Sequence, residues 1–127
     1  MNWKIIHSYS RAQAIADGVL VDVGEAAEKH GFIVPVAMTS ACWAEAVAWD
    51  QEPYLQDESA RLDDVLLLAV LAASRSRVGR TSRLDFVVAR VENGLGEMVP
   101  TDLELSLVAG PGDAGEPVLT VMLRDED

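Results

Sequence analysis

One apolar periodicity in the middle of the chain constrains the fold more than any other feature. Between residues 57 and 75 the apolar side chains recur at the helical spacing of three and four, at Leu62, Val65, Leu66, Ala69, Val70 and Ala73. Leucines at positions 67, 68 and 71 add apolar surface on the flanking faces. A helix that is apolar on several sides packs against several neighbours. We therefore expect a long central helix over about residues 57–75.

The pattern changes at residue 84, where apolar and other residues begin to alternate along the chain. Three such segments cover residues 84–91, 103–108 and 118–123, as expected for half-buried strands. The turn sequence Asn93-Gly94 and the glycine-rich residues 110–117 separate them. Three consecutive strands with short connections indicate an antiparallel meander.

The first part of the chain predicts three shorter helices, over residues 11–17, 25–30 and 40–49. Ser8 or Ser10 caps the first helix, and Gly18 ends it. Residues 19–23 read as a brief strand or an extended segment. Residues 32–36 are expected to be extended, because Pro35 disfavours a helix at the residue before it.

These elements predict the α+β class, with helices that precede the strands rather than alternate with them. The expected fold is a single compact domain over residues 1–127. Its helical part covers about residues 1–77, and its long central helix packs on a three-stranded antiparallel C-terminal meander at about residues 84–124. A homodimer is an alternative to a monomer if one edge of that sheet is uncovered.

The sequence favours a cytoplasmic protein that does not enter a membrane. The first residues lack a long apolar stretch followed by a cleavage site, so no secretory signal is expected. The longest apolar run, residues 65–73, is far shorter than the roughly 20 residues of a membrane-spanning helix. Cys42 is the single cysteine, which rules out an intrachain disulfide. Without Cys or His at zinc-site spacing, we expect no metal and no cofactor.

Candidate catalytic groups are sparse. Cys42 would need a neighbouring base to act as a nucleophile, and the histidines available are His7 and His30. We interpret Cys42 as a small buried apolar residue, because it lies in a segment rich in alanine and tryptophan. The paired carboxylates Asp57-Glu58 and Asp63-Asp64 are interpreted mainly as favourable charges in the first turns of the long helix.

The distribution of charge is the most informative feature for function. The formal net charge is −11. Residues 1–74 carry 4 basic and 11 acidic side chains, residues 75–90 carry 5 and 1, and residues 91–127 carry 1 and 9. An acidic molecule of this kind is repelled by phosphate backbones, so no direct binding of nucleic acid is expected.

The arginines of the basic segment allow two interpretations. In the first, they complement the carboxyl end of the long helix and pair with neighbouring acids. In the second, Arg77, Arg80 and Arg83 form an anion-binding patch, because the guanidinium fork binds phosphate and carboxylate groups in a bidentate manner.

Five blocks of the chain resemble a family of small uncharacterised bacterial proteins that are often carried by plasmids and phages. They are YSRAQAIADGVLVDV (9–23), FIVPV followed by Met38-Thr39, the helix from Trp43 to Trp49, RLDDVL (61–66) and GPGDAGEPVLTVML (110–123). The resemblance implies no activity and no catalytic residues. Carriage on mobile elements implies an accessory role.

Our leading hypothesis is therefore a non-catalytic, acidic accessory protein of a mobile element. It would inhibit or adapt a host nucleic-acid-processing or defence complex, of the anti-CRISPR or anti-restriction type, whose basic surface it binds. The expected binding face contains Asp50, Glu52, Asp57 and Glu58, with the C-terminal acids as the alternative face.

The alternative hypothesis is a domain that binds a small molecule or acts as an enzyme on an unknown substrate. Its pocket would lie between the long helix and the sheet, with walls formed by Arg61, Trp43, Trp49 and Tyr54.

Overall fold

The protein is an α+β fold built on a five-stranded mixed sheet. The computed structural model describes residues 9–50, 56–75, 82–93 and 99–126. Its helices are α2 (Arg11–Ala16), α3 (Gly24–Lys29), α4 (Ser40–Ala46) and α5 (Glu58–Arg75). Its strands are β1 (Leu20–Asp22), β2 (Val36–Thr39), β3 (Arg83–Val91), β4 (Pro100–Pro111) and β5 (Pro117–Leu123). The strand order in the sheet is β1-β2-β5-β4-β3.

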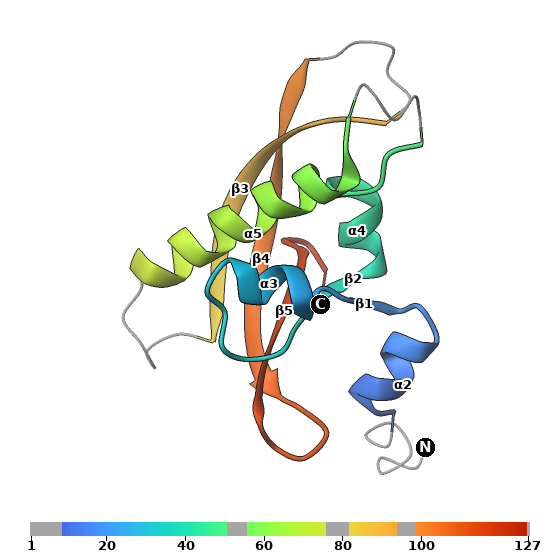
Figure 1. Ribbon diagram of the computed structural model, residues 1–127, viewed down its shortest axis with the longest axis vertical. Coiled ribbons are helices and arrows are strands. Elements are labelled where there is room, and N and C mark those ends of the chain that lie inside the picture. Colours follow the sequence, from blue (N-terminus) through green and yellow to red (C-terminus); the bar gives the residue numbers. More distant parts are fainter. Residues whose placement is uncertain (1–8, 51–55, 76–81, 94–98, 127) are drawn as a thin grey trace.

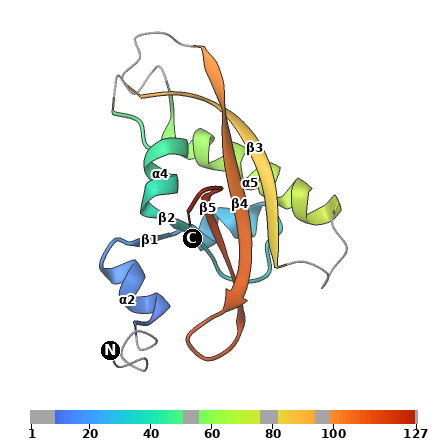
Figure 2. The ribbon, with the colours of Figure 1, turned by 180° about the vertical axis from the view of Figure 1, so that it is seen from behind.

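The helices α3 and α5 lie on one face of the sheet. Figure 1 shows α5 crossing in front of the long, curved β3 and β4, with α3 beside it. The reverse view in Figure 2 shows β3 and β4 in front of α5. Apolar side chains from α5 and the sheet meet in one core cluster, in which Leu66, Leu105, Met38 and Val121 are fully buried. This packing agrees with the central position expected for the long helix.

The prediction of a three-stranded antiparallel meander is wrong. The three C-terminal strands β3, β4 and β5 do pair consecutively and antiparallel, but two strands from the first half of the chain extend the sheet. The strand β2 pairs parallel to β5, with Val36 opposite Leu119 and Met38 opposite Val121. The strand β1 then pairs antiparallel to β2. Three consecutive residues of β2 are buried, so both of its faces are covered and the alternation that marks a strand is missing.

The N-terminus of the short helix α2 is held by side chains of its own first turn and by Asp113 from a distant loop. Ser10 caps it, with its Oγ accepting from the Gln13 N–H at 3.0 Å while Gln13 Oε1 accepts from the Ser10 N–H at 3.0 Å. The Asp113 carboxylate accepts from the N–H groups of Arg11 and Ala12 at 2.7 and 3.1 Å. The four amide donors at the start of the helix therefore all have side-chain acceptors.

The helix α4 ends three residues before the predicted end at Trp49. Thr39 caps its start, with its Oγ1 accepting from the Cys42 N–H at 3.1 Å. The carbonyls of Val47 and Ala48 accept hydrogen bonds from Arg61 and Asn93, which come from α5 and from the end of β3. A longer helix would use these carbonyls as acceptors of its own backbone hydrogen bonds. Here side chains take that place, and the helix ends before them. No helix within the described ranges combines the length and apolarity needed to cross a membrane.

Candidate functional site

The acids of the expected binding face lie where the chain after α4 meets the start of α5. Asp50, Asp57 and Glu58 are exposed, and Glu52 lies outside the described residues. Asp57 Oδ1 accepts from the Ser59 N–H at 2.9 Å, and Glu58 Oε2 accepts from the Trp49 N–H at 2.9 Å. These two carboxylates thus fix the start of α5 while they remain open to solvent.

The C-terminal acids have a different arrangement. Asp125 is exposed, whereas Glu126 folds back on the sheet. Its Oε1 accepts from the Thr39 hydroxyl at 2.7 Å and from the Leu123 N–H at 2.9 Å. Glu126 is therefore engaged in holding the end of β5 against β2.

Two arginines are turned inward beside the acidic residues. The exposed fraction is 5% for Arg61 of α5 and 7% for Arg90 of β3. Arg61 donates from Nε to the Val47 carbonyl at 2.9 Å and from Nη1 to the Val91 carbonyl at 2.8 Å. Its guanidinium lies over the Trp49 ring, 5.3 Å from the centroid. Arg61 therefore ties α5 to the ends of α4 and β3.

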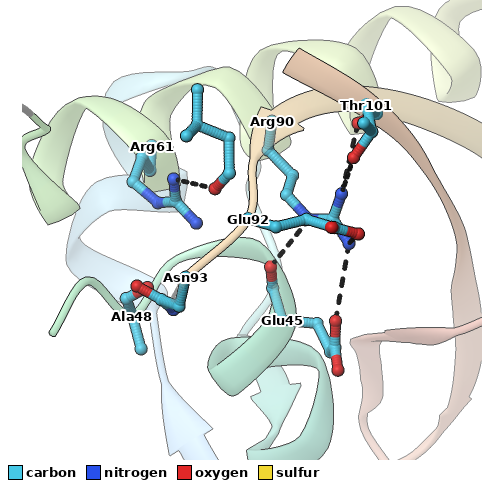
Figure 3. Close-up of polar contacts among 8 residues, drawn as sticks. Glu45, Ala48, Arg61, Arg90, Glu92, Asn93 and Thr101 are labelled. Carbon is cyan, nitrogen blue, oxygen red and sulfur yellow. Dashed lines mark hydrogen bonds and ion pairs between the residues drawn. The ribbon is translucent and has the colours of Figure 1, made fainter. Parts of the chain in front are cut away.

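Arg90 connects the same region to α4 and β4. Its Nε donates to the Glu45 carbonyl at 3.0 Å, and its Nη1 donates to the Thr101 hydroxyl at 2.6 Å. The Nη2 group lies 3.5 Å from Glu45 Oε2 and 3.3 Å from Glu92 Oε1. Figure 3 shows Arg61 and Arg90 reaching into this corner from a helix and a strand, with Glu45 and Asn93 close by.

A cavity of about 210 Å³ lies beside both arginines. Its lining includes Gln56, Asp64 and Pro100 as well as Arg61 and Arg90. The Nη2 atom of Arg61 is buried and has no hydrogen-bond partner among the described residues. Burial lowers the pKa of Arg61, the positive charge of Arg90 lowers it further, and Glu58 opposes both effects. The charged side chains that line the cavity are Arg61, Arg90 and Asp64, and their net charge is positive.

The predicted anion-binding patch is described at one of its three positions. Arg83 Nε lies 3.5 Å from Asp85 Oδ1, and its Nη2 donates to the Arg124 carbonyl. Arg77 and Arg80 lie outside the described residues. Asp85 also accepts from the Ser106 hydroxyl at 2.6 Å. This hydrogen bond, together with the charges of Arg124 and Arg83, holds the pKa of Asp85 below its ordinary value, while burial opposes the shift.

Cys42 is fully buried in α4, and its pKa is raised to about 12, first by burial and then by the charge of Glu126. The thiol is therefore protonated at neutral pH and is a poor nucleophile. His30 lies at the end of α3, with its Nε2 3.0 Å from Asp63 Oδ1, and His7 is outside the described residues. Within the described part of the chain, no three His, Cys, Asp or Glu side chains are grouped to hold a metal.

The residues of the alternative pocket are only partly brought together. Arg61 and Trp49 stack on each other, while Trp43 packs against the core from α4. Tyr54 lies outside the described residues. In the sequence Arg90 belongs to the basic segment, and its position beside Arg61 does not follow from that assignment. The alternation of Phe86, Val88 and Arg90 places these residues on one face of a strand, which was the available signal.

Comparison with known proteins gives a family without an assigned activity. The description of the matching family is "Family of unknown function (DUF6573)", and the match covers residues 2–127. No curated protein and no solved structure matches the chain.

Proposed function

Because the chain belongs to a family of unknown function (DUF6573), we propose its role from its surface: a non-catalytic accessory protein that binds a partner through exposed carboxylates. The proposed partner is a nucleic-acid-processing or defence complex of the host, and the protein would act as its inhibitor on behalf of a plasmid or phage. Such complexes carry basic surfaces that hold phosphate backbones. An acidic protein of this size is complementary to them.

The inward orientation of the arginines carries this proposal. Arg61 and Arg90 are almost fully buried, and Arg11 donates to the Thr120 hydroxyl and the Leu119 carbonyl. Two cations are thereby directed toward the interior, whereas Asp50, Asp57 and other acids stay exposed. Together with the net charge of −11, this leaves an excess of negative charge at the surface, which favours attraction to a basic partner.

The exposed side of α5 adds apolar groups next to these acids. Asp63 and Asp64 are exposed in its second turn, and Leu67 and Leu71 follow with exposed fractions of 46% and 39%. Positions four residues apart lie on the same side of a helix. Apolar side chains surrounded by charge resemble the centre and rim of protein interfaces. We therefore place the partner over the exposed side of α5 as far as Leu71 and over the adjacent Asp50.

The test is affinity capture from a host extract with matched charge-reversal variants. The site variant replaces Asp50, Glu52, Asp57 and Glu58 by lysine. The control variant makes the same change of charge elsewhere, replacing four acids that are also exposed, namely Glu25, Glu28, Asp102 and Asp125. We expect the site variant to lose the captured complex and the control to retain it. High salt should weaken capture by the wild type, because it screens the attraction between exposed charges.

A stability measurement and a second variant complete this experiment. Thermal melting is needed because Asp57 and Glu58 also accept hydrogen bonds at the start of α5. A double variant with lysine at Asp50 and Glu52 leaves these bonds intact and should weaken capture in the same direction. Equal capture by the site and control variants would show that this face is not the binding surface.

Binding of a small molecule is a second candidate function, favoured by one observation. A cavity of about 210 Å³ lies beside Arg61 and Arg90. Of the residues expected to form the walls of such a pocket, Arg61 lines this cavity and stacks on Trp49.

A further inference from the structure

One edge of the sheet is open along β3. This strand is the last in the order β1-β2-β5-β4-β3, and within the described ranges it pairs with β4 alone. It runs for nine residues in unbroken register, whereas the strand at the opposite edge, β1, has three residues. Edge strands of monomeric proteins are usually short, interrupted or covered, because their free backbone groups pair with other strands. The long edge of β3 is therefore the place where this sheet can be extended.

The hydrogen bonds between β3 and β4 show which backbone groups point outward. The Ala109 N–H donates to the Ser82 carbonyl at 2.7 Å, and these two residues continue the register of the pair by one position. Opposed residues in an antiparallel ladder alternate between hydrogen-bonded and non-hydrogen-bonded pairs. The even-numbered residues of β3 therefore bond to β4, and the odd-numbered residues direct their N–H and C=O groups away from it.

The outward groups in the middle of β3 can bind a further strand. The Val91 carbonyl, at the end of β3, accepts from Nη1 of Arg61 at 2.8 Å, as its outward direction requires. The N–H and C=O groups of Asp85, Val87 and Ala89 have no hydrogen-bond partner in another described segment, and their side chains are exposed. A strand laid along β3 would satisfy these donors and acceptors without breaking a hydrogen bond to β4.

An apolar groove follows the same edge. Its volume is about 440 Å³, and its walls are residues 84–87 of β3 and Leu68, Leu71, Ala72 and Arg75 of α5. Both ribbon views show the second half of α5 extending past β3, so that the helix overhangs the open edge (Figures 1 and 2). Leu71 and Val87 are 39% and 43% exposed. A further strand beside β3 would lie beneath the overhang and cover both side chains.

The charges along the groove favour a second copy of this chain as the occupant. The side of α5 that faces the edge carries, at spacings of three and four, Asp64, Leu68, Leu71 and Arg75. This side is acidic at one end, apolar in its centre and basic at the other end. A second α5 that runs antiparallel to the first would place its Arg75 next to Asp64 and its leucines against the leucines. The two charges cancel there although the chain carries a net charge of −11, so this surface does not repel its copy.

We infer that the chain forms a symmetric dimer in which the β3 strands of two copies pair antiparallel and join the two sheets. Val87 is the middle residue of Arg83–Val91, so a two-fold axis at Val87 pairs the whole strand with its copy. Asp85 then lies opposite Ala89 of the second copy, and no two like charges are directly opposed along the strand.

Analytical ultracentrifugation of the purified full chain tests for the dimer. We expect reversible association, with the mass rising to twice that of one chain as the protein concentration increases. Amide hydrogen exchange locates the interface, because the N–H groups of Val87 and Ala89 point to solvent in a single copy and should gain protection with concentration. The Phe86 and Val88 N–H groups bond to β4 in both states and should change far less. The mass of one chain up to millimolar protein would overturn the inference.

Variants at Val87 test the strand pairing. Val87→Pro removes an outward N–H, which an edge strand tolerates, and should raise the Kd of the dimer about 10- to 100-fold because two hydrogen bonds are lost at the axis. Val87→Thr keeps the N–H and should leave the Kd nearly unchanged. If the proline variant does not fold, Val87→Lys places two like charges at the axis, and Ile33→Lys makes the same change of charge at a side chain that is 97% exposed outside the sheet. An equal Kd in the two lysine variants would refute the assignment.

An exchange of charge between two variants tests the antiparallel arrangement of α5. Asp64→Lys places a like charge opposite Arg75 of the second copy, and Arg75→Glu places one opposite Asp64. Each variant alone should dimerise more weakly than the wild type. An equimolar mixture should recover the dimer, because both contacts are then between opposite charges. A mixture as weak as the single variants would contradict this arrangement.

The dimer and the surface proposed for the partner meet at Leu71, and their tests are independent. Sedimentation uses the purified chain, so its result does not depend on capture from a host extract. The decisive variant is Val87→Lys, which lies outside the partner surface. Loss of the dimer with intact capture would show two separate surfaces, and loss of both would show that the partner binds the dimer.

Discussion

Removal of the Asp113 carboxylate should loosen α2 more than any other part of the molecule. Both oxygens of Asp113 accept backbone N–H groups, from Arg11 at 2.7 Å and from Ala12 at 3.1 Å. The helix has few other attachments. Ala14 is its one buried residue, and the Arg11 side chain binds Thr120 and the Leu119 carbonyl. The six-residue helix therefore depends on this cap from a loop about a hundred residues away.

The magnitude follows from the loss of two capping hydrogen bonds. Substitution of a capping side chain by alanine destabilises a helix by about 0.5–2 kcal/mol, and a carboxylate near the helix N-terminus adds a favourable interaction with the helix dipole. For Asp113→Ala we expect about 1–2 kcal/mol at α2. An opening free energy lowered by this amount speeds amide exchange roughly 5- to 30-fold.

The assay is amide hydrogen exchange of the two variants Asp113→Ala and Glu116→Ala. Glu116 is in the same loop, and both carboxylates act through space on Arg11, where they oppose the lowering of its pKa by burial. Glu116 accepts at 3.4 Å from the Ala114 N–H within its own loop. We expect faster exchange in residues 11–16 for Asp113→Ala only. Equal acceleration in both variants would mean that charge, rather than the two hydrogen bonds, holds the helix.

Three further predictions concern the core, the outer face of the sheet and the thiol. Leu66→Ala should destabilise the fold by about 2–5 kcal/mol in chemical denaturation, because Leu66 is fully buried, while Leu67→Ala at an exposed site should change stability by about 0.5 kcal/mol or less. Ser106→Ala removes the hydrogen bond that most lowers the pKa of Asp85, so the pKa of this carboxyl measured by NMR titration should rise. A lowered pKa stabilises the folded protein at pH values above the ordinary pKa of the carboxyl, and this contribution is lost as the pH falls through the pKa of the folded state. The stability of the variant should therefore depend less on pH in acid. An unchanged dependence would contradict the assignment. Cys42 should resist alkylation at neutral pH in the folded protein and react readily in denaturant, because it is fully buried with a pKa raised to about 12.

The helix boundaries, apart from the end of α4, could be predicted because their signals are local. Ser10 and Thr39 accept hydrogen bonds from the amides that their positions suggest, and Gly18 follows α2 with a positive φ of 78°. The long helix also begins and ends where the periodicity indicates. In these cases the side chain that decides the structure lies within a few residues of the backbone it acts on.

The sheet could not be predicted in full because its pairing depends on distant segments. Val36–Thr39 is short and buried on both faces, so neither length nor alternation identifies it as a strand. Its parallel pairing to β5 joins residues about eighty positions apart. The alternation in β3, β4 and β5 and their short connections predict antiparallel pairing. Nothing in this pattern indicates that β5 is a central strand.

Part of the candidate site could be predicted, because the burial of each arginine follows from a local periodicity. Arg61 lies four residues before Val65 and eight before Ala69, and all three are buried on one side of α5. Arg90 continues the buried face of β3 in the same manner. Each periodicity alone places one arginine inside the protein. Their proximity arises only when α5 crosses β3, which is a property of the tertiary fold.

The burial of these two arginines affects the charge of the exterior. A lysine or arginine at the surface would screen neighbouring carboxylates, whereas Arg61 and Arg90 donate to carbonyls of Val47, Val91, Glu45 and other buried groups. Arg90 also pairs with Glu45 and Glu92. The two cations therefore join secondary-structure elements, and neither forms an ion pair with Asp50, Asp57 or Glu58 in the described structure.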